Sequence, residues 1–130
     1  MRLESDVKED HSLKALARSF KYAMAGILTA MQISRNIKVH YLIGSVVIAA
    51  GWYFHISPLE YVALLLVIGQ VICLEMVNTA IEKTVDLFTR EHRLYAKIAK
   101  DVAAGAVLMA VFIAAAVGTM IFLPHLLSLR

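Results

Sequence analysis

Four polar side chains follow an uncharged run of the sequence and are spaced to share one helical face. Glu75, Asn78, Glu82 and Asp86 are separated by three, four and four residues. At about 100° per residue, their side chains fall within a sector of roughly 80°. A charge inside a bilayer costs on the order of 2.5–3.5 kcal/mol on insertion scales. Acidic groups kept in register at the end of a membrane helix therefore predict metal binding or proton transfer.

A second polar pair, Lys100 and Asp101, begins the next apolar stretch. Oxygen ligands suit Mg²⁺ rather than zinc, and a lysine beside a Mg²⁺ site suits phosphate. Glu75 is the deepest of the acids, where a carboxylate is removed from water and can take a proton from a lipid hydroxyl. The two groups together predict phosphoryl transfer from a water-soluble donor to a membrane alcohol.

A structural alternative stays open for the same residues. The acids can pair with Lys83, Lys97 and Lys100 and serve only to fix helix packing. The sequence also has no Gly-x-x-x-x-Gly-Lys-Ser/Thr loop and no kinase glycine-rich loop. If ATP is the donor, it binds without a standard nucleotide-binding fold.

Composition assigns the chain to the integral membrane proteins. It has 130 residues, of which 60% are hydrophobic, and this length suits a single domain, 1–130. The net charge of +3 comes from basic residues that flank apolar runs, so anionic lipid headgroups explain it better than nucleic acid does. The single cysteine, Cys73, excludes an intramolecular disulfide.

The N-terminal part divides into a polar tail, 1–12, and an amphipathic helix, 13–34. The tail lacks the apolar segment and cleavage site of a signal peptide. In the helix, apolar residues recur at steps of three and four, while Lys14, Arg18 and Lys21 lie mostly off that stripe. Such a helix lies in the membrane interface or packs on other helices of the same chain, and the pattern allows both.

Three apolar segments predict three membrane helices, at 39–54, 59–86 and 102–123. The first is slightly short for a bilayer, and the second is long enough to project its acidic turns into water. The segment 87–100 is polar and basic, and Pro124 is expected to end the third helix. Small residues at four-residue steps in that helix predict close packing against a neighbouring helix: Ala106, Ala110, Ala114 and Gly118.

Charge predicts the orientation of these helices. Basic residues precede the first segment and lie between the second and third, whereas 55–58 contains no Lys or Arg. The positive-inside rule then places the N-terminus in the cytoplasm and the C-terminus outside. The acidic face opens on the cytoplasmic side, where ATP and Mg²⁺ are found.

The run from Glu75 to Asp86, EMVNTAIEKTVD, followed by AKDVAAGAV from Ala99, resembles the small bacterial integral-membrane diacylglycerol kinase family. Within that family, Arg35-Asn36 with His40, and the closing Ile121-Phe-Leu-Pro124, resemble the Gram-positive undecaprenol kinase branch. The similarity covers nearly the whole chain from Ser19 to Pro124.

The resemblance implies a homotrimer of three-span subunits with an N-terminal surface helix and active sites shared between subunits in the bacterial plasma membrane. It implies phosphorylation of a lipid alcohol by ATP and Mg²⁺. Glu75 matches the general base, Asn78 a residue that positions the site, and Glu82 a metal ligand. Other positions match nucleotide-contacting or supporting residues of the family: Arg18, Tyr22, Asp86, Lys100 and Asp101.

One position departs from the family pattern. Where the family has a glutamate before Arg-Asn, which shares metal binding with the residue matched by Glu82, this chain has Ser34. A hydroxyl is a weaker Mg²⁺ ligand than a carboxylate. The favoured function is undecaprenol kinase; the alternatives are a diacylglycerol kinase and a catalytically weakened or non-catalytic relative. A metal transporter is disfavoured, because the acids cluster at one end of one helix.

Overall fold

The computed structural model describes residues 13–88 and 93–128, which are almost entirely helical. These ranges form α1 (Leu13–Ile33), α2 (Arg35–Tyr53), α3 (Pro58–Phe88) and α4 (Leu94–Ser128). The predicted polar tail 1–12, the residues 89–92 of the predicted basic segment, and 129–130 lie outside the described residues. The all-α fold class is confirmed.

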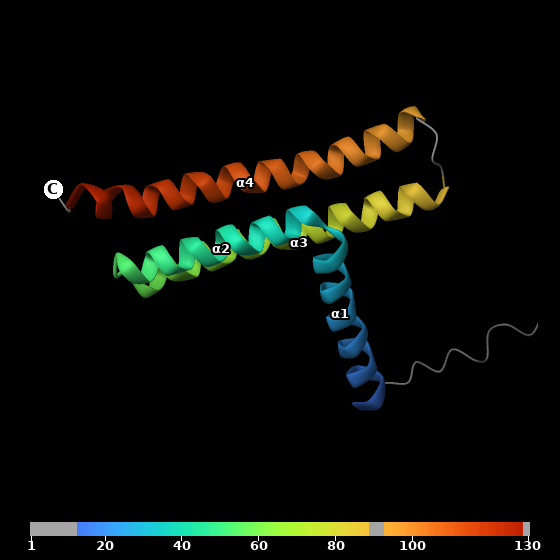
Figure 1. The fold of residues 1–130 in the computed structure, drawn as a ribbon, viewed down its shortest axis with the longest axis horizontal. Coiled ribbons are helices and arrows are strands. Elements are labelled where there is room, and N and C mark those ends of the chain that lie inside the picture. Colours follow the sequence, from blue (N-terminus) through green and yellow to red (C-terminus); the bar gives the residue numbers. More distant parts are fainter. Residues whose placement is uncertain (1–12, 89–92, 129–130) are drawn as a thin grey trace, which may run out of the picture.

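Helices α2, α3 and α4 run side by side along the long axis of the molecule, and α1 projects from them at a steep angle (Figure 1). Successive helices of this bundle are antiparallel, and α3 packs against both α2 and α4. The central position of α3 gives it two neighbours on which to bury a stripe of side chains.

Most of α1 is solvent-exposed in the single chain, including Lys14, Arg18 and Tyr22. Only Ala30, near its C-terminal end, is buried. Of the two arrangements that the sequence allows, packing on the same chain therefore applies only near that end. The rest of α1 presents its apolar stripe outward, as a helix in the membrane interface does.

Ser34 separates α1 from α2. Its backbone is extended, and its hydroxyl oxygen accepts a hydrogen bond of 3.3 Å from the backbone N–H of Ile37, which makes it the N-cap of α2. Helix α2 begins at Arg35, one turn before residue 39, where the first membrane segment is expected to begin. The charges of Arg35 and Lys38 are typical of a polar connection, but both residues belong to the capped first turn of α2.

The turn between α2 and α3 is held by caps on both sides. His55 has a positive φ of 53°, and the N–H groups of His55 and Ile56 donate to the carbonyls of Trp52 and Gly51, as in a Schellman motif. At the start of α3, Ser57 and Glu60 exchange hydrogen bonds of 2.7 and 3.3 Å in a capping box.

Helices α3 and α4 are both long and apolar enough to cross a membrane. Their 31 and 35 residues correspond to roughly 46 and 52 Å, against a hydrocarbon core of about 30 Å. Both helices therefore extend beyond the core. Helix α2 has 19 residues, and only about 22 Å of it lies beyond Lys38. As a third crossing, α2 remains a prediction.

Helix α4 is longer than the sequence pattern indicates at both ends. It begins at Leu94, inside the segment expected to be a polar connection, where Lys97 pairs with Asp101 one turn later. It also continues through Pro124 to Ser128. His125 Nδ1 lies 2.8 Å from the carbonyl oxygen of Ile121. The histidine ring can therefore donate a hydrogen bond to a backbone carbonyl next to the proline.

The buried residues of α4 only partly follow the predicted small-residue stripe. Ala110 is buried, but Ala106 is exposed, and a Cβ added at Gly118 would meet no atom within 4 Å. A glycine contact of this kind lies instead between α2 and α3, where a Cβ on Gly44 would come within 2.8 Å of Ile68 Cγ2. The stripe therefore does not mark one continuous close contact within the chain.

Candidate active site

The buried stripe of α3 changes from apolar to polar at Glu75. Leu64 and Val71 are buried in the apolar half, and Glu75 and Asn78 continue the same face at steps of four and three. Glu75 is only 3% exposed, and Asn78 only 5%. Two polar side chains thus lie inside the bundle, on the common face that their spacing predicts.

Asn78 lies between the two acids and is bonded to one of them. Its Nδ2 donates a 3.3 Å hydrogen bond to Oε1 of the half-buried Glu82. Its other polar atom, Oδ1, is buried without a hydrogen-bond partner. A buried unpaired acceptor is costly, so this atom is available to a donor that residues 13–88 and 93–128 do not supply.

Thr79 is a buried polar residue that the sequence pattern did not indicate. Its hydroxyl donates a 2.9 Å hydrogen bond to the backbone carbonyl of Glu75. A threonine in a helix commonly donates its hydroxyl hydrogen to the backbone carbonyl four residues earlier. The Thr79 hydroxyl is therefore used within the helix turn from Glu75 to Thr79 and does not add a free polar group to the site.

Asp86 and Lys100 join α3 to α4 at the outer end of the polar face. Lys100 Nζ lies 2.6 Å from Asp86 Oδ1, and Lys97 Nζ lies 2.5 Å from Asp101 Oδ2. The pairing that the structural alternative predicted is therefore present for these four residues. The pairs are partly exposed, so they contribute little stability by themselves and their lysines stay accessible to an anion.

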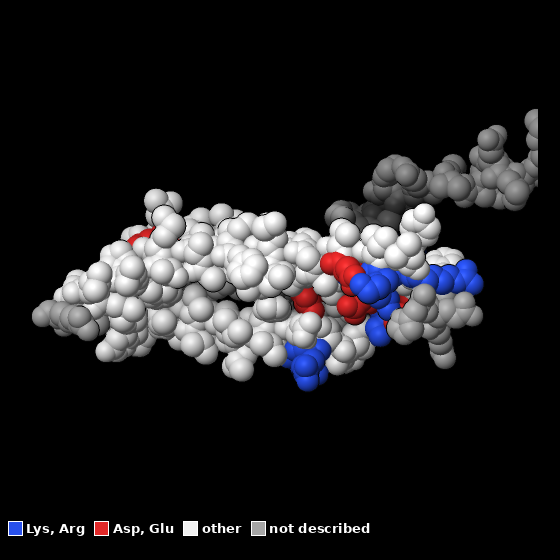
Figure 2. Space-filling view, turned by 90° about the horizontal axis from the view of Figure 1, so that it is seen from above, with Lys and Arg blue, Asp and Glu red and all other residues white. Residues whose placement is uncertain are grey.

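Charged side chains gather toward the end of the bundle at which α3 leads to α4, while most of the visible face elsewhere is uncharged (Figure 2). Eleven residues separate Glu75 from Asp86, a distance of roughly 16 Å along the helix axis. The polar face thus runs from the charged end of the molecule into its apolar body.

The register of α2 on α3 places Ser34 near this face. Gly44 lies against Ile68. Seven residues before Gly44 is Ile37, which is fully buried, and seven residues after Ile68 is Glu75. Extending the same antiparallel register brings Ser34 level with Asn78. Position 34 is therefore between the levels of Glu75 and Glu82.

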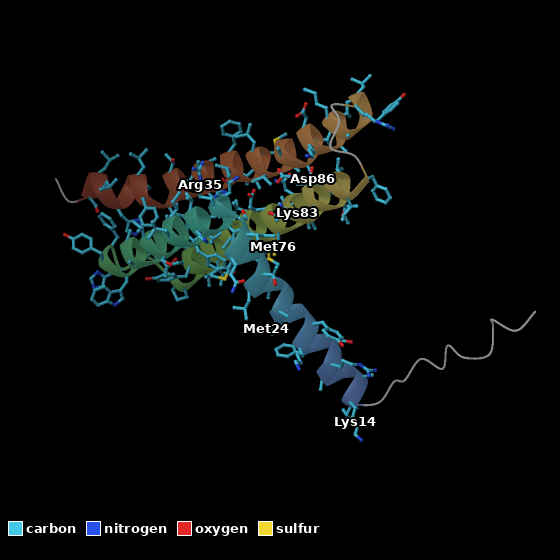
Figure 3. All side chains as sticks on the ribbon, turned by 45° about the vertical axis from the view of Figure 1, so that its right-hand side comes forward. Lys14, Met24, Arg35, Met76, Lys83 and Asp86 are labelled. Atoms are coloured by element: carbon cyan, nitrogen blue, oxygen red, sulfur yellow. The ribbon has the colours of Figure 1, made fainter. Side chains whose placement is uncertain are left out.

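Arg18 and Tyr22 are not gathered at this face within one chain. They lie on the part of α1 between Lys14 and Met24, which points away from the bundle, whereas Lys83 and Asp86 lie along α3 (Figure 3). Within one chain, therefore, these two residues do not line the polar face of α3.

The donor set fits a metal that arrives with a nucleotide. In the ranges that the structure describes, no three His, Cys, Asp or Glu side chains come together around one point. Mg²⁺ is commonly held by one or two carboxylates together with substrate phosphates. The half-buried carboxylate of Glu82 can provide one such ligand, while the Ser34 oxygen is engaged in capping α2.

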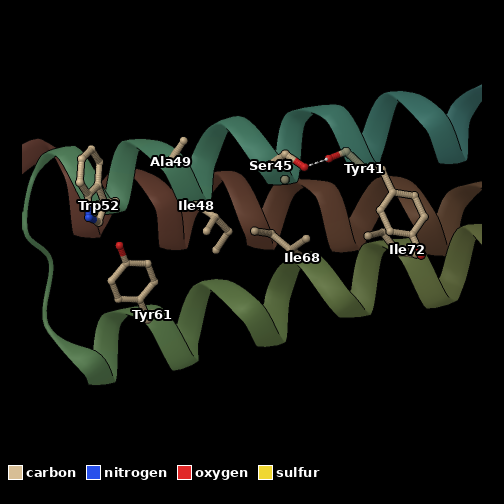
Figure 4. Close-up of a pocket in the computed structure, with 9 residues that line it drawn as sticks. Tyr41, Ser45, Ile48, Ala49, Trp52, Tyr61, Ile68 and Ile72 are labelled. Carbon is tan, nitrogen blue, oxygen red and sulfur yellow. Dashed lines mark hydrogen bonds between the residues drawn. The ribbon is translucent and has the colours of Figure 1, made fainter.

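Two grooves flank the bundle near the polar face. One, of about 380 Å³, runs between α3 and α4 and includes Asn78 among apolar residues such as Ala103 and Ala106. The other, of about 700 Å³, lies between α2 and α3, from Tyr41 and Ile72 to Trp52 and Tyr61 (Figure 4). In that groove the Ser45 hydroxyl is bonded to the carbonyl of Tyr41. Both are open, apolar surfaces suited to hydrocarbon.

Comparison with known proteins assigns the chain to a family. The profile of prokaryotic diacylglycerol kinase matches residues 21–122, which include α2, α3 and most of α4. The chain belongs to this family. It is therefore a membrane-bound lipid kinase that uses ATP, and the resemblance drawn from the EMVNTAIEKTVD run is confirmed.

Two characterised relatives carry different substrate names. The chain is 40% identical over 120 residues to the undecaprenol kinase of Bacillus subtilis, covering 91% of this chain and 98% of that protein. It is 45% identical over 113 residues to the diacylglycerol kinase of a Synechocystis strain, covering 85% of this chain and 64% of that protein. Because the two sequence identities are similar, they do not by themselves distinguish undecaprenol from diacylglycerol as the lipid acceptor.

Proposed function

We propose that this lipid kinase transfers the γ-phosphoryl group of MgATP to undecaprenol, giving undecaprenyl phosphate and ADP. The observation that carries the proposal is the buried polar end of the α3 stripe, where Glu75 and Asn78 lie inside an apolar bundle. A reacting hydroxyl at that depth belongs to a lipid rather than to a soluble alcohol.

The α3 side chains divide the proposed reaction among themselves. Glu75 takes the proton of the lipid hydroxyl as its oxygen attacks the γ-phosphorus, and the bond to the β,γ-bridging oxygen breaks as ADP leaves. Asn78, whose Oδ1 has no partner in the single chain, orients the hydroxyl or the phosphate beside Glu75. General base catalysis of this kind typically contributes 10²–10⁴-fold in rate.

Glu82 and the outer charges hold the nucleotide in this proposal. Glu82 ligates Mg²⁺, which neutralises charge on the phosphate oxygens when it is bound. Lys100 offers its ammonium to phosphate, and Asp86 and Asp101 fix the two lysines, Lys100 and Lys97, through the ion pairs described above. The site faces the cytoplasm, with the N-terminus on the same side and α2 as the third membrane crossing.

We further propose a homotrimer in which α1 of one subunit contributes residues to the active site of its neighbour. The projection of α1 from its own bundle supports the proposal that its Arg18 and Tyr22 contact the nucleotide at a neighbouring subunit. Mixing subunits that carry Arg18→Ala with subunits that carry Glu75→Gln tests this arrangement. Recovery of activity on mixing supports shared sites, and equal inactivity of mixed and separate variants contradicts them.

The full-length correspondence to the undecaprenol kinase favours undecaprenol, since that relative is covered over 98% of its length. The 45% identity to the diacylglycerol kinase makes diacylglycerol the second candidate. Labelled-phosphate transfer to both lipids in the same mixed micelles separates them. We expect a higher kcat/KM for undecaprenol; a higher value for diacylglycerol would reverse the assignment, and transfer to neither lipid would support the weakened relative.

A further inference from the structure

A narrow apolar space lies between α2, α3 and α4, on the buried side of α3. It has a volume of about 270 Å³ and includes Gly44 and Val47 of α2, Leu64 and Val71 of α3, and Ala114 and Gly118 of α4. We call it the three-helix slot. Unlike the 700 Å³ groove of Figure 4, it has walls from three helices rather than two.

The slot exists because α4 has small residues where it faces α2. A Cβ added at Gly118 would meet no atom within 4 Å, so that part of the stripe borders open space. The lining has few polar atoms that need a hydrogen bond from a bound molecule. Thr119 Oγ1 is already bonded to the carbonyl oxygen of Ala115 at 2.8 Å, and the remaining lining is apolar except for His40.

The floor of the slot is continuous with the reacting groups. Leu64 and Val71 belong to the same buried stripe of α3 as Glu75 and Asn78, and Val71 precedes Glu75 by one helical turn, roughly 6 Å. On α4, the lining extends from Val111 to Phe122, or roughly 16 Å along the axis, about half of the hydrocarbon core.

From this continuity, and relying on the lipid-kinase function proposed above, we propose that the three-helix slot binds the hydrocarbon chain of the lipid alcohol next to its hydroxyl. A chain lying in the slot ends at Glu75, with its hydroxyl at the polar part of the stripe. A volume of about 270 Å³ spread along a lining of roughly 16 Å suits the proximal part of a single prenyl chain.

The slot acts on orientation more than on affinity. A chain that moves from the bilayer into the slot exchanges one apolar environment for another, so little hydrophobic free energy is gained. What the slot provides is a fixed position for the hydroxyl, and a misplacement of about 1 Å is enough to cost on the order of 10²-fold in rate.

Filling the slot tests the proposal. Gly118→Leu places a side chain in the open space, and Ala116→Leu adds the same side chain on an exposed part of α4 that does not line the slot. We expect Gly118→Leu to lower kcat/KM for undecaprenol by at least about tenfold with the KM for ATP unchanged. Equal losses in the two variants, or no loss in Gly118→Leu, would overturn the proposal.

Photolabelling gives a readout that does not depend on turnover. A short prenol with a diazirine beside its hydroxyl is expected to label slot residues of α2, α3 and α4 in the wild-type protein, and to lose that labelling in Gly118→Leu but not in Ala116→Leu. Labelling confined to outward-facing residues, or unchanged by Gly118→Leu, would refute the slot. A protein that binds the probe there but phosphorylates no lipid would contradict the proposed function and leave the slot supported.

Discussion

At the scale of single residues, Ser34 has a structural role at a position of proposed functional importance. Its hydroxyl caps α2 by accepting the Ile37 N–H, and the resemblance to the family implies a metal-binding glutamate at the same position. A glutamate at this position adds a carboxylate but removes a preferred N-cap, a loss of typically about 1 kcal/mol. Aspartate is the more informative replacement, because it caps a helix well and also offers a carboxylate.

We therefore predict that Ser34→Asp raises turnover or lowers the Mg²⁺ concentration needed for half-maximal activity. Ser34→Asn is the matched control, since it keeps the cap and adds no charge. The gain is expected to disappear in the Ser34→Asp/Glu82→Gln double variant, because both carboxylates act on one ion. Mg²⁺ titrations of the four proteins that show identical curves for Asp and Asn would mean that position 34 does not reach the metal.

The sequence was informative about the polar residues of α3 and less so about their surroundings. The spacing of Glu75, Asn78 and Glu82 requires a common face in any helix, so their alignment was predictable. Which of them is buried depends on neighbouring helices. The unpaired Oδ1 of Asn78 and the bond from Thr79 to the Glu75 carbonyl arise from that packing, and spacing alone does not indicate them.

At the scale of the elements, α2 and α3 are in tight contact at a glycine, Gly44. A Cβ on Gly44 would lie 2.8 Å from Cγ2 of Ile68, a methyl group held close to the backbone of α3. Because this contact sets the register that brings Ile37 level with Glu75, a change at Gly44 affects both packing and the position of the site.

We predict that Gly44→Ala destabilises the protein by about 1–3 kcal/mol, the usual cost of overpacking. Gly69→Ala is the control, since its added Cβ meets nothing within 4 Å and alanine favours helix formation. Thermal unfolding in detergent is expected to show a lower Tm for Gly44→Ala and an equal or higher Tm for Gly69→Ala. A Gly44→Ala protein with the wild-type Tm would show that α2 can shift at no cost.

The ion pair between α3 and α4 gives a second prediction at this scale. Lys100→Ala removes both the partner of Asp86 at 2.6 Å and the proposed phosphate contact. We expect the KM for ATP to rise at least about tenfold while the KM for the lipid changes little. Lys97→Ala, which removes the exposed pair with Asp101, is expected to raise the KM for ATP less than Lys100→Ala does. A raised lipid KM with an unchanged ATP KM would contradict the assignment of Lys100 to the nucleotide.

Helix ends were the least predictable elements. The start of α2 at Arg35 and the start of α4 at Leu94 both lie among basic residues, which resemble a connection when hydropathy alone is considered. A serine cap and an i, i+4 ion pair are the local features that stabilise these turns. Pro124 was expected to end α4, but the helix continues to Ser128. Next to the proline, the His125 ring nitrogen lies within hydrogen-bonding distance of the Ile121 carbonyl oxygen.

At the scale of the whole molecule, charge is segregated along the long axis, with the polar face of α3 reaching from the charged end into the apolar body (Figure 2). In the proposed function, this arrangement lets a soluble nucleotide and a membrane lipid meet on one helix. The apolar end of α3 also carries a glutamate, Glu60, which is half-buried and engaged in the capping box with Ser57. The same helix therefore offers a glutamate buried inside the bundle and one that caps its first turn for comparison.

The most direct measurement is labelled-phosphate transfer to the lipid by Glu75→Gln and Glu60→Gln. Glutamine nearly preserves shape in both, and it is accepted in a capping box. The account predicts a 10²–10⁴-fold lower kcat for Glu75→Gln with an unchanged oligomer, and wild-type transfer for Glu60→Gln. If Glu75→Gln retains more than about a tenth of wild-type turnover, the buried glutamate is not the base and the central claim is wrong.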